Sequence, residues 1–107
     1  MIPFEKCGLS TQTQEQLNSV FVKYPNIEKI ILYGSRAKGN YKIGSDIDLT
    51  IIGPKMNLND LLKIYDEIDD LLLPYKVDLS LFHTIDNPEL IAHIERAGIE
   101  LYSGLAV

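Results

Sequence analysis

The fold class predicted by this sequence is α/β (α+β), with a small mixed β-sheet of three or four strands flanked by helices. Short runs rich in isoleucine, leucine and valine alternate with longer segments whose apolar residues recur at helical spacing. Proline, glycine and asparagine separate these segments. The connection between the first two apolar runs is too short for a long crossover helix, so we expect these strands to be antiparallel and the sheet to be mixed.

The first half of the chain contains two predicted strands and two predicted helices. Thr11 and Gln14 have the spacing of a capping box, which predicts a helix that ends before Pro25. The predicted elements after it are a buried strand over 27–33, a short helix over 35–38 and a second strand over 46–52.

The second half of the chain repeats this alternation. Its predicted elements are a helix that begins at Asn57 or Asn59, a strand over 76–82, a helix from Asn87 to Gly98, and an edge strand or tail over 99–105. An apolar stripe is expected on the first of these helices, formed by Leu58, Leu61, Leu62, Tyr65, Ile68 and Leu72.

The composition indicates one globular domain over residues 1–107. The 107 residues suffice for one compact core, and 46% of them are hydrophobic. Charged residues make up 23%, which is close to the globular average. The net charge of −5 argues against a polynucleotide as the main ligand, because nucleic-acid binders usually carry a basic surface. A mononucleotide held by a metal ion remains compatible with this charge.

The sequence predicts a cytoplasmic protein without a membrane segment. Cys7 is its single cysteine, so no disulfide forms within the chain and a reducing compartment is expected. No apolar run approaches the roughly 20 residues that span a bilayer. The N-terminal residues lack the basic and apolar regions of a signal peptide.

Three aspartates form the predicted metal site. Asp46 and Asp48 alternate on the second strand, so both carboxylates project from one face, where their repulsion favours a bound cation. Asp78 lies on the third strand and adds a third carboxylate. Magnesium prefers such oxygen ligands together with phosphate oxygens and water, and this set suits two ions. Asp78 is also a candidate general base for an incoming hydroxyl.

A short turn after the first strand forms the predicted phosphate site. Gly34 lets phosphate oxygens approach the backbone, and Ser35 offers a hydroxyl and a candidate N-cap at a helix start. Arg36 supplies a cation in the same segment and is expected to contact phosphate. Ser45 precedes the first aspartate and is expected to contact phosphate or a metal-bound water. Gly34, Ser35, Arg36 and Ser45 are therefore the predicted nucleotide-binding residues.

The order Gly34-Ser35, ten residues, Asp46-Ile47-Asp48 and a later strand with Asp78 resembles the signature of the nucleotidyltransferase superfamily that includes DNA polymerase beta. The resemblance is closest to the minimal nucleotidyltransferases, small proteins often paired with a helical HEPN partner in toxin–antitoxin modules. It implies the nucleotidyltransferase fold, contacts from Gly34 and Ser35 to a triphosphate, and magnesium bound by the three aspartates.

The resemblance further implies transfer of AMP from ATP to a hydroxyl acceptor, with a tyrosine of a HEPN partner as one acceptor and an antitoxin role. Larger relatives, such as kanamycin nucleotidyltransferases, carry a second helical domain that completes the acceptor site. We expect a HEPN-type or substrate-binding-domain-like partner to supply it here in a hetero-oligomer.

Two other functions remain open from the sequence. The chain can be a nucleotide-binding module that neutralises a helical partner without catalysis, docking through an exposed apolar tail of Leu101, Tyr102, Leu105 and Val107. It can also be a structural subunit without a ligand. Among the remaining candidates, His83 and His93 are expected at or near the surface rather than on a metal, and Tyr33 is expected in the core. Whether Tyr41 stacks on a base stays open.

Overall fold

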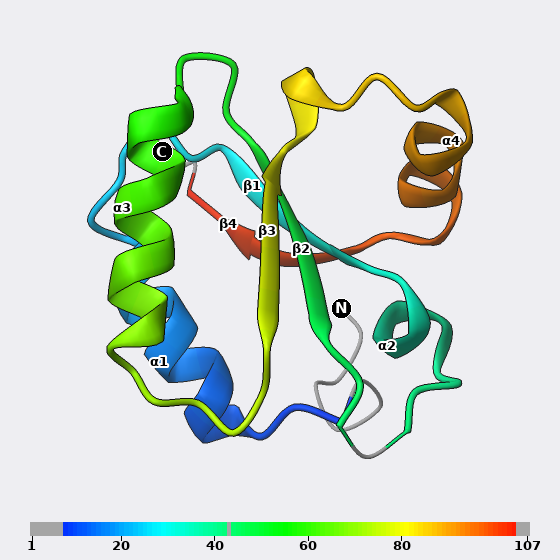
Figure 1. Ribbon diagram of the computed structural model, residues 1–107, viewed down its shortest axis with the longest axis horizontal. Helices are drawn as coiled ribbons and strands as arrows, with labels where there is room; N and C mark the ends of the chain where they lie inside the picture. The colour runs from blue at the N-terminus through cyan, green and yellow to red at the C-terminus, as the bar shows by residue number, and fades with distance from the viewer. Residues whose placement is uncertain (1–7, 43, 105–107) are drawn as a thin grey trace.

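The computed structural model describes residues 8–42 and 44–104, which form one four-stranded sheet with helices on both faces (Figure 1). The elements in chain order are α1 (Thr11–Phe21), β1 (Lys29–Tyr33), α2 (Ser35–Lys38), β2 (Ile47–Ile52), α3 (Leu58–Asp69), β3 (Val77–Leu81), the 3-10 helix η2 (Phe82–Thr84), α4 (Pro88–Ala97) and β4 (Ile99–Ser103). None of the helices in these ranges has the length and apolar character needed to cross a membrane.

The sheet is mixed, with the strand order β3-β2-β1-β4. β1 pairs antiparallel with both β2 and β4, whereas β2 and β3 run parallel. The predicted antiparallel pairing of the first two strands is therefore confirmed, and so is the mixed sheet. α3 supplies the crossover that a parallel pair requires between β2 and β3.

The helix starts differ slightly from those predicted. Ser10 is the N-cap of α1 and accepts a hydrogen bond from the Thr13 amide, so the predicted capping box between Thr11 and Gln14 is wrong and the N-cap lies one residue earlier. The Gln14 side chain instead donates to the buried carbonyl of Leu101 at 2.9 Å and ties α1 to β4. Asn57 is the residue that caps α3, in a capping box with Asp60.

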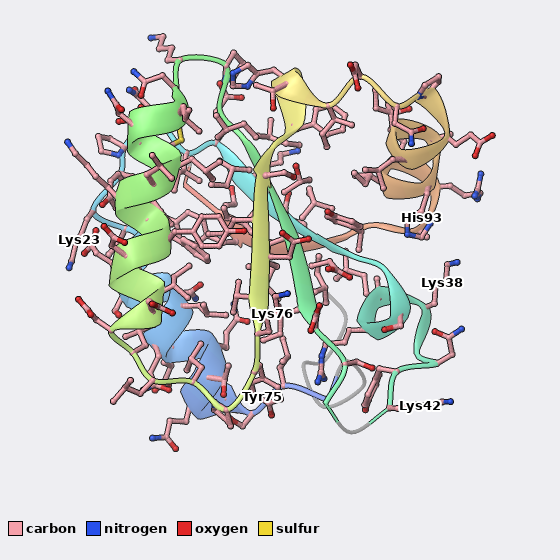
Figure 2. The ribbon with its side chains drawn as sticks, in the orientation of Figure 1. Lys23, Lys38, Lys42, Tyr75, Lys76 and His93 are labelled. Carbon is pink, nitrogen blue, oxygen red and sulfur yellow. The ribbon has the colours of Figure 1, made fainter. Side chains whose placement is uncertain are left out.

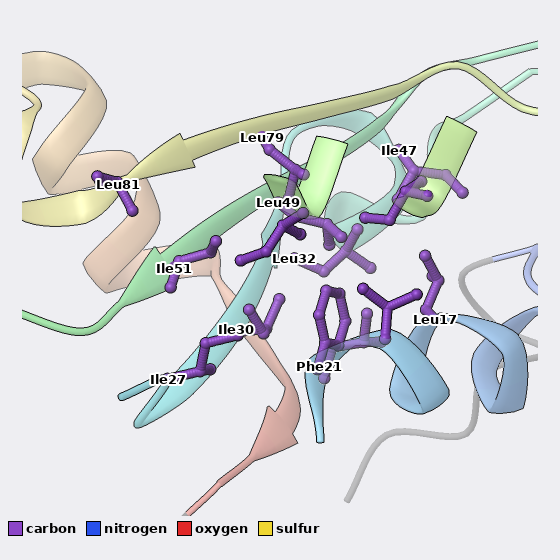
Figure 3. Close-up of a cluster of buried hydrophobic side chains, with 14 of the residues drawn as sticks. Leu17, Phe21, Ile27, Ile30, Leu32, Ile47, Leu49, Ile51, Leu79 and Leu81 are labelled. Carbon is purple, nitrogen blue, oxygen red and sulfur yellow. The ribbon is translucent and has the colours of Figure 1, made fainter. Parts of the chain in front are cut away.

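The hydrophobic core lies on the face of the sheet that α1 and α3 cover, while α2 and α4 lie on the other side (Figure 1). Alternate strand residues point into it, because successive side chains of a strand face opposite ways. Figure 3 shows this cluster, whose labelled members are Leu17, Phe21, Ile27, Ile30, Leu32, Ile47, Leu49, Ile51, Leu79 and Leu81.

The apolar stripe predicted on α3 is partly wrong. Ile64 and Ile68 are the buried residues of this helix, whereas Leu58 and Leu62 are 64% and 52% exposed. The helix turns the side that carries Ile64 and Ile68 toward the sheet, so leucines at its flank stay in solvent. Leu72 follows the helix with a positive φ of 54° and is 87% exposed.

The apolar tail predicted to be exposed is also different in the structure. Leu101 is buried in the core, and the ring of Tyr102 packs on Phe21 with 5.5 Å between ring centroids. β4 pairing with β1 explains the difference, because it draws this segment onto the sheet. Cys7, Leu105 and Val107 lie outside the described residues.

The core predicts a clear contrast between two Leu→Ala substitutions. Leu49 is fully buried, so Leu49→Ala should lower the free energy of unfolding by about 2–5 kcal/mol through lost burial and the cavity left behind. Leu72→Ala is the control and should change it by no more than about 0.5 kcal/mol. Urea denaturation of both variants measures the difference, and equal losses would contradict this assignment of the core.

Candidate functional site

The carboxylates predicted for metal binding come from the parallel pair β2 and β3. Asp48 and Asp78 are direct register partners, and each is followed by a buried leucine that faces the core, so their own side chains face the opposite side. Asp46 immediately precedes β2 and is exposed. The register thus brings the predicted carboxylates of two strands to one end of the sheet, on the face opposite the core.

The electrostatics of this end are unfavourable for Asp48. Burial raises the pKa of its carboxyl above the ordinary 3.8, and the charges of Asp78 and Asp46 raise it further. A cation at this place would remove the mutual repulsion. The donor set therefore fits a metal ion by its chemistry.

The carboxylates gathered here are too few to complete the shell of a metal ion by themselves. In residues 8–42 and 44–104, no group of three histidine, cysteine, aspartate or glutamate side chains is gathered so as to hold a metal ion. Magnesium usually takes one or two carboxylates and fills its remaining positions with phosphate oxygens and water. The arrangement of Asp48 and Asp78 is compatible with that division of ligands between protein and substrate.

Gly34 packs directly against Asp48. It is the N-cap of α2, with φ 80° and ψ −156°, a backbone conformation open essentially to glycine alone. A Cβ at this position would lie 2.4 Å from Oδ2 of Asp48, far inside van der Waals contact. Its amide donates a 3.1 Å hydrogen bond to Nε2 of His93 on α4. Only glycine therefore brings the turn this close to the carboxylate.

The two predicted serines both follow Gly34 in the chain, Ser35 directly and Ser45 in the loop before β2. Ser35 is the first residue of α2 and is half-buried; the N-cap predicted there is Gly34 instead, because the backbone enters helical geometry only at Ser35. The Ser45 hydroxyl accepts a 2.8 Å hydrogen bond from the Lys42 amide and so stabilises the loop before β2. Contacts from either serine to a nucleotide remain predictions.

Arg36 holds two loops together in this structure. Its Nε and Nη2 donate to the Ser45 carbonyl at 3.2 and 3.0 Å. The guanidinium carbon also lies 5.0 Å from the ring centroid of Tyr41 and 4.8 Å from that of Tyr75, in cation–π geometry. Arg36 is only 2% exposed, so a direct phosphate contact would require it to leave this position. Its predicted role at phosphate stays a prediction.

Tyr65 orients Asp78, a role that the sequence did not suggest. Its hydroxyl lies 3.2 Å from Oδ1 of Asp78, to which it can donate, and accepts a 2.7 Å hydrogen bond from the Leu79 amide. Burial raises the pKa of the Tyr65 hydroxyl above the ordinary 10.0. The sequence had placed Tyr65 in an apolar stripe, where helical spacing gives no sign of a polar contact across to β3.

Lys76 is a cation immediately before β3, two residues from Asp78 (Figure 2). Its carbonyl accepts a 2.8 Å hydrogen bond from the Ile47 amide, which holds Lys76 next to the start of β2. The side chain is exposed, and the ion pairs in the described part of the chain join Lys23 to Glu67 and Lys29 to Glu100. In the sequence, Lys76 lies two residues before Asp78, and this spacing indicates that both side chains leave the strand on the same face.

The aromatic and histidine predictions have mixed outcomes. Tyr33 was expected in the core, but it lies half-buried on the opposite face, because Leu32 takes the core-facing position of β1. His83 is exposed and His93 is half-buried, as expected. The contact of His93 with Gly34 was not foreseen, since 59 residues separate them.

A glycine turn at a helix start, packed against one of two aspartates that are paired across strands of a mixed sheet, is the arrangement of a nucleotidyltransferase. The family model described as polymerase beta, nucleotidyltransferase, matches residues 15–104. The chain therefore belongs to this family, and the resemblance first inferred from its glycine, serine and aspartates is confirmed.

A curated relative gives a more specific comparison. The protein named Putative protein adenylyltransferase from Methanocaldococcus jannaschii is 42% identical over 65 residues, which cover 60% of this chain and 61% of that protein. The match thus spans less than two thirds of the length of this relative.

Solved structures share the fold. A chain in the crystal structure of a toxin–antitoxin with AMP-PNP matches with a TM-score of 0.68 and 18% identity, over 84% of this chain and 73% of that one. A chain in the complex of the tri-AMPylated Shewanella oneidensis HEPN toxin with its MNT antitoxin matches with a TM-score of 0.59 and 18% identity, over 85% and 72%. At such identities the likeness establishes the nucleotidyltransferase fold.

The Gly34 geometry predicts that a methyl group there is harmful. Gly34→Ala should cost about 1–3 kcal/mol of stability from backbone strain and also displace the Asp48 carboxylate. Gly39→Ala is the matched control: its φ is 82°, but nothing lies within 4 Å of its Cβ position. The control should cost only about 1 kcal/mol. Urea denaturation measures both, and equal costs would contradict the contact with Asp48.

The raised pKa of Asp48 predicts a pH-dependent gain in stability for Asp48→Asn. The folded protein binds the Asp48 proton more tightly than the unfolded chain, so its free energy of unfolding falls as pH rises above about 3.8. In chelator at about pH 7, Asp48→Asn should therefore melt at a higher temperature than the wild type. The gain should disappear below the ordinary aspartate pKa. A variant that is less stable at neutral pH would contradict this.

Proposed function

We propose that this chain transfers AMP from ATP to a hydroxyl acceptor in a magnesium-dependent reaction and acts as an antitoxin on a HEPN partner. The observation that carries the proposal is Asp48, which lies between Asp78 and the close-packed Gly34 in a chain of the nucleotidyltransferase family. Nucleotidyltransferases of this type generally use a divalent metal. Magnesium is proposed here because the carboxylate set leaves ligand positions for phosphate and water.

The aspartates would hold the metal and Asp78 would also take a proton. Asp46, Asp48 and Asp78 are the proposed ligands, and two bound ions would supply charge stabilisation for the attacking and leaving oxygens. The acceptor oxygen forms a bond to the α-phosphorus, and the bond from that phosphorus to the pyrophosphate oxygen breaks. The hydroxyl proton passes to Asp78, whose carboxylate Tyr65 holds in place.

The remaining residues of the site would bind the triphosphate or hold the loops that do so. Ser35 presents its amide and hydroxyl at the start of α2, and Lys76 lies at the end of the sheet where the carboxylates gather. Arg36 would act by fixing the loop that carries Ser45, through the hydrogen bonds to the Ser45 carbonyl. Excess negative charge at the carboxylates makes a metal-bound nucleotide a better ligand than a free one.

The proposed acceptor is a tyrosine of a HEPN-type helical partner in a hetero-oligomer. The AMPylated HEPN toxin in the Shewanella oneidensis complex and the name of the Methanocaldococcus jannaschii relative support this choice. We place the reaction in the cytoplasm, in keeping with a sequence whose single cysteine is Cys7.

Labelled nucleotide tests the proposal directly. The chain is mixed with magnesium, ATP labelled on the α-phosphate, and the helical protein encoded beside it. Label should appear on a tyrosine of that protein. Asp48→Asn should reduce transfer at least about 100-fold because an essential ligand is lost. Asp66→Asn on the exposed side of α3 is the control and should react like the wild type.

The same experiment separates catalysis from binding alone. If ATP and the partner bind but no label reaches any acceptor, the transferase proposal is wrong. Asp46→Asn combined with Asp48→Asn then decides about the antitoxin role. Full neutralisation of the partner by this double variant would show that docking suffices, whereas lost neutralisation together with lost transfer supports the catalytic role.

A further inference from the structure

His93 joins the last helix to the glycine turn. It lies on α4, on the side that faces α2 (Figure 2). Its Nε2 accepts a 3.1 Å hydrogen bond from the Gly34 amide. The half-buried ring also meets Tyr33 edge-on, with ring centroids 6.2 Å apart and planes at 76°. Nε2 must be unprotonated to accept this hydrogen bond, so the neutral ring carries its proton on Nδ1.

The turn that His93 holds has little support from its own helix. α2 has only four residues, and its backbone bonds from Lys38 to Gly34 and from Asn40 to Ser35 close barely one turn. So short a helix does not hold its shape by itself. The position of Gly34 therefore depends on contacts from outside α2, with Asp48 on one side and His93 on the other.

The hydrogen bond to His93 also changes whether the Gly34 amide can donate to a phosphate. A glycine amide at a phosphate-binding turn would ordinarily be a donor to phosphate. Here that donor is already used by an imidazole nitrogen. A phosphate at Gly34 would have to displace His93, whereas a phosphate at the Ser35 amide or hydroxyl would not.

We propose that His93 is a positioning residue for the donor nucleotide. It anchors the Gly34 amide, and this anchor presents Ser35 to the triphosphate while Gly34 stays packed on Asp48. The Gly34 amide then serves the shape of the turn and is not itself a phosphate donor. The inference rests on the proposed function for the identity of the ligand, but the anchor exists in the free protein and is testable there.

Nuclear magnetic resonance of the ¹⁵N-labelled full chain tests the anchor. In the free protein, above neutral pH, the imidazole nitrogens of His93 should show the tautomer with Nδ1 protonated, and the Gly34 amide should be protected from hydrogen exchange. Both signals should persist after saturation with a non-hydrolysable ATP analogue and magnesium. A change of the His93 tautomer, or release of the Gly34 amide to the nucleotide, would overturn the proposal.

Two substitutions separate the hydrogen bond from packing. His93→Phe keeps a ring beside Tyr33 but removes the acceptor, so it should expose the Gly34 amide to exchange. It should also weaken binding of the analogue about three- to tenfold, the effect of one lost hydrogen bond. His93→Gln keeps an acceptor at similar reach and should bind within about twofold of the wild type, an effect well below that of one lost hydrogen bond. Calorimetric titration measures both affinities.

The outcomes distinguish this inference from the proposed function. Wild-type affinity in His93→Phe, or equal weakening in both variants, would overturn the positioning role while leaving nucleotidyl transfer intact. Failure of the wild-type chain to bind the analogue would overturn the proposed function and the nucleotide part of this inference together. Protection of Gly34 that is lost in His93→Phe and kept in His93→Gln, with matching affinities, supports it.

Discussion

The parallel pairing of β2 with β3 is the constraint on which the candidate site depends. Its register makes Asp48 and Asp78 neighbours, while Leu49 and Leu79 one step along each strand are buried in the core. A slip of one residue would exchange these faces, placing carboxylates in the core and leucines in water. Burial of the leucines therefore fixes the carboxylates side by side, despite their repulsion. Core packing stabilises an arrangement that electrostatics alone would disfavour.

The elements around the carboxylates are tied together by polar contacts of buried or half-buried groups. Arg36 links α2 to the carbonyl of Ser45 before β2, and its cation–π contact reaches Tyr75 before β3. His93 links α4 to Gly34, and Tyr65 links α3 to Asp78. Segments far apart in the sequence thus meet at one end of the sheet. The site has its shape because each of these side chains holds a neighbouring backbone or carboxylate.

The sequence was sufficient for the fold class and for the residues whose pattern is local. Alternation along β2 and the short loop before it predicted the face of the aspartates and the antiparallel pairing with β1. Contacts across long sequence separations were beyond such patterns. Periodicity placed Tyr65 among apolar residues, and charge alone assigned Arg36 to phosphate, although the structure buries it between two aromatic rings. Which polar groups meet depends on packing that only the assembled sheet defines.

The hydroxyl of Tyr65 has a second consequence at the border of the sheet. β3 is an outer strand, and outer strands expose unpaired backbone groups that can recruit strands of other chains. While its single hydroxyl hydrogen is donated to Asp78, Tyr65 still accepts a 2.7 Å hydrogen bond from the Leu79 amide, so it occupies one backbone donor at the middle of β3. The side chain that orients Asp78 therefore also hinders the addition of a strand from another chain to the β3 edge, and with it aggregation.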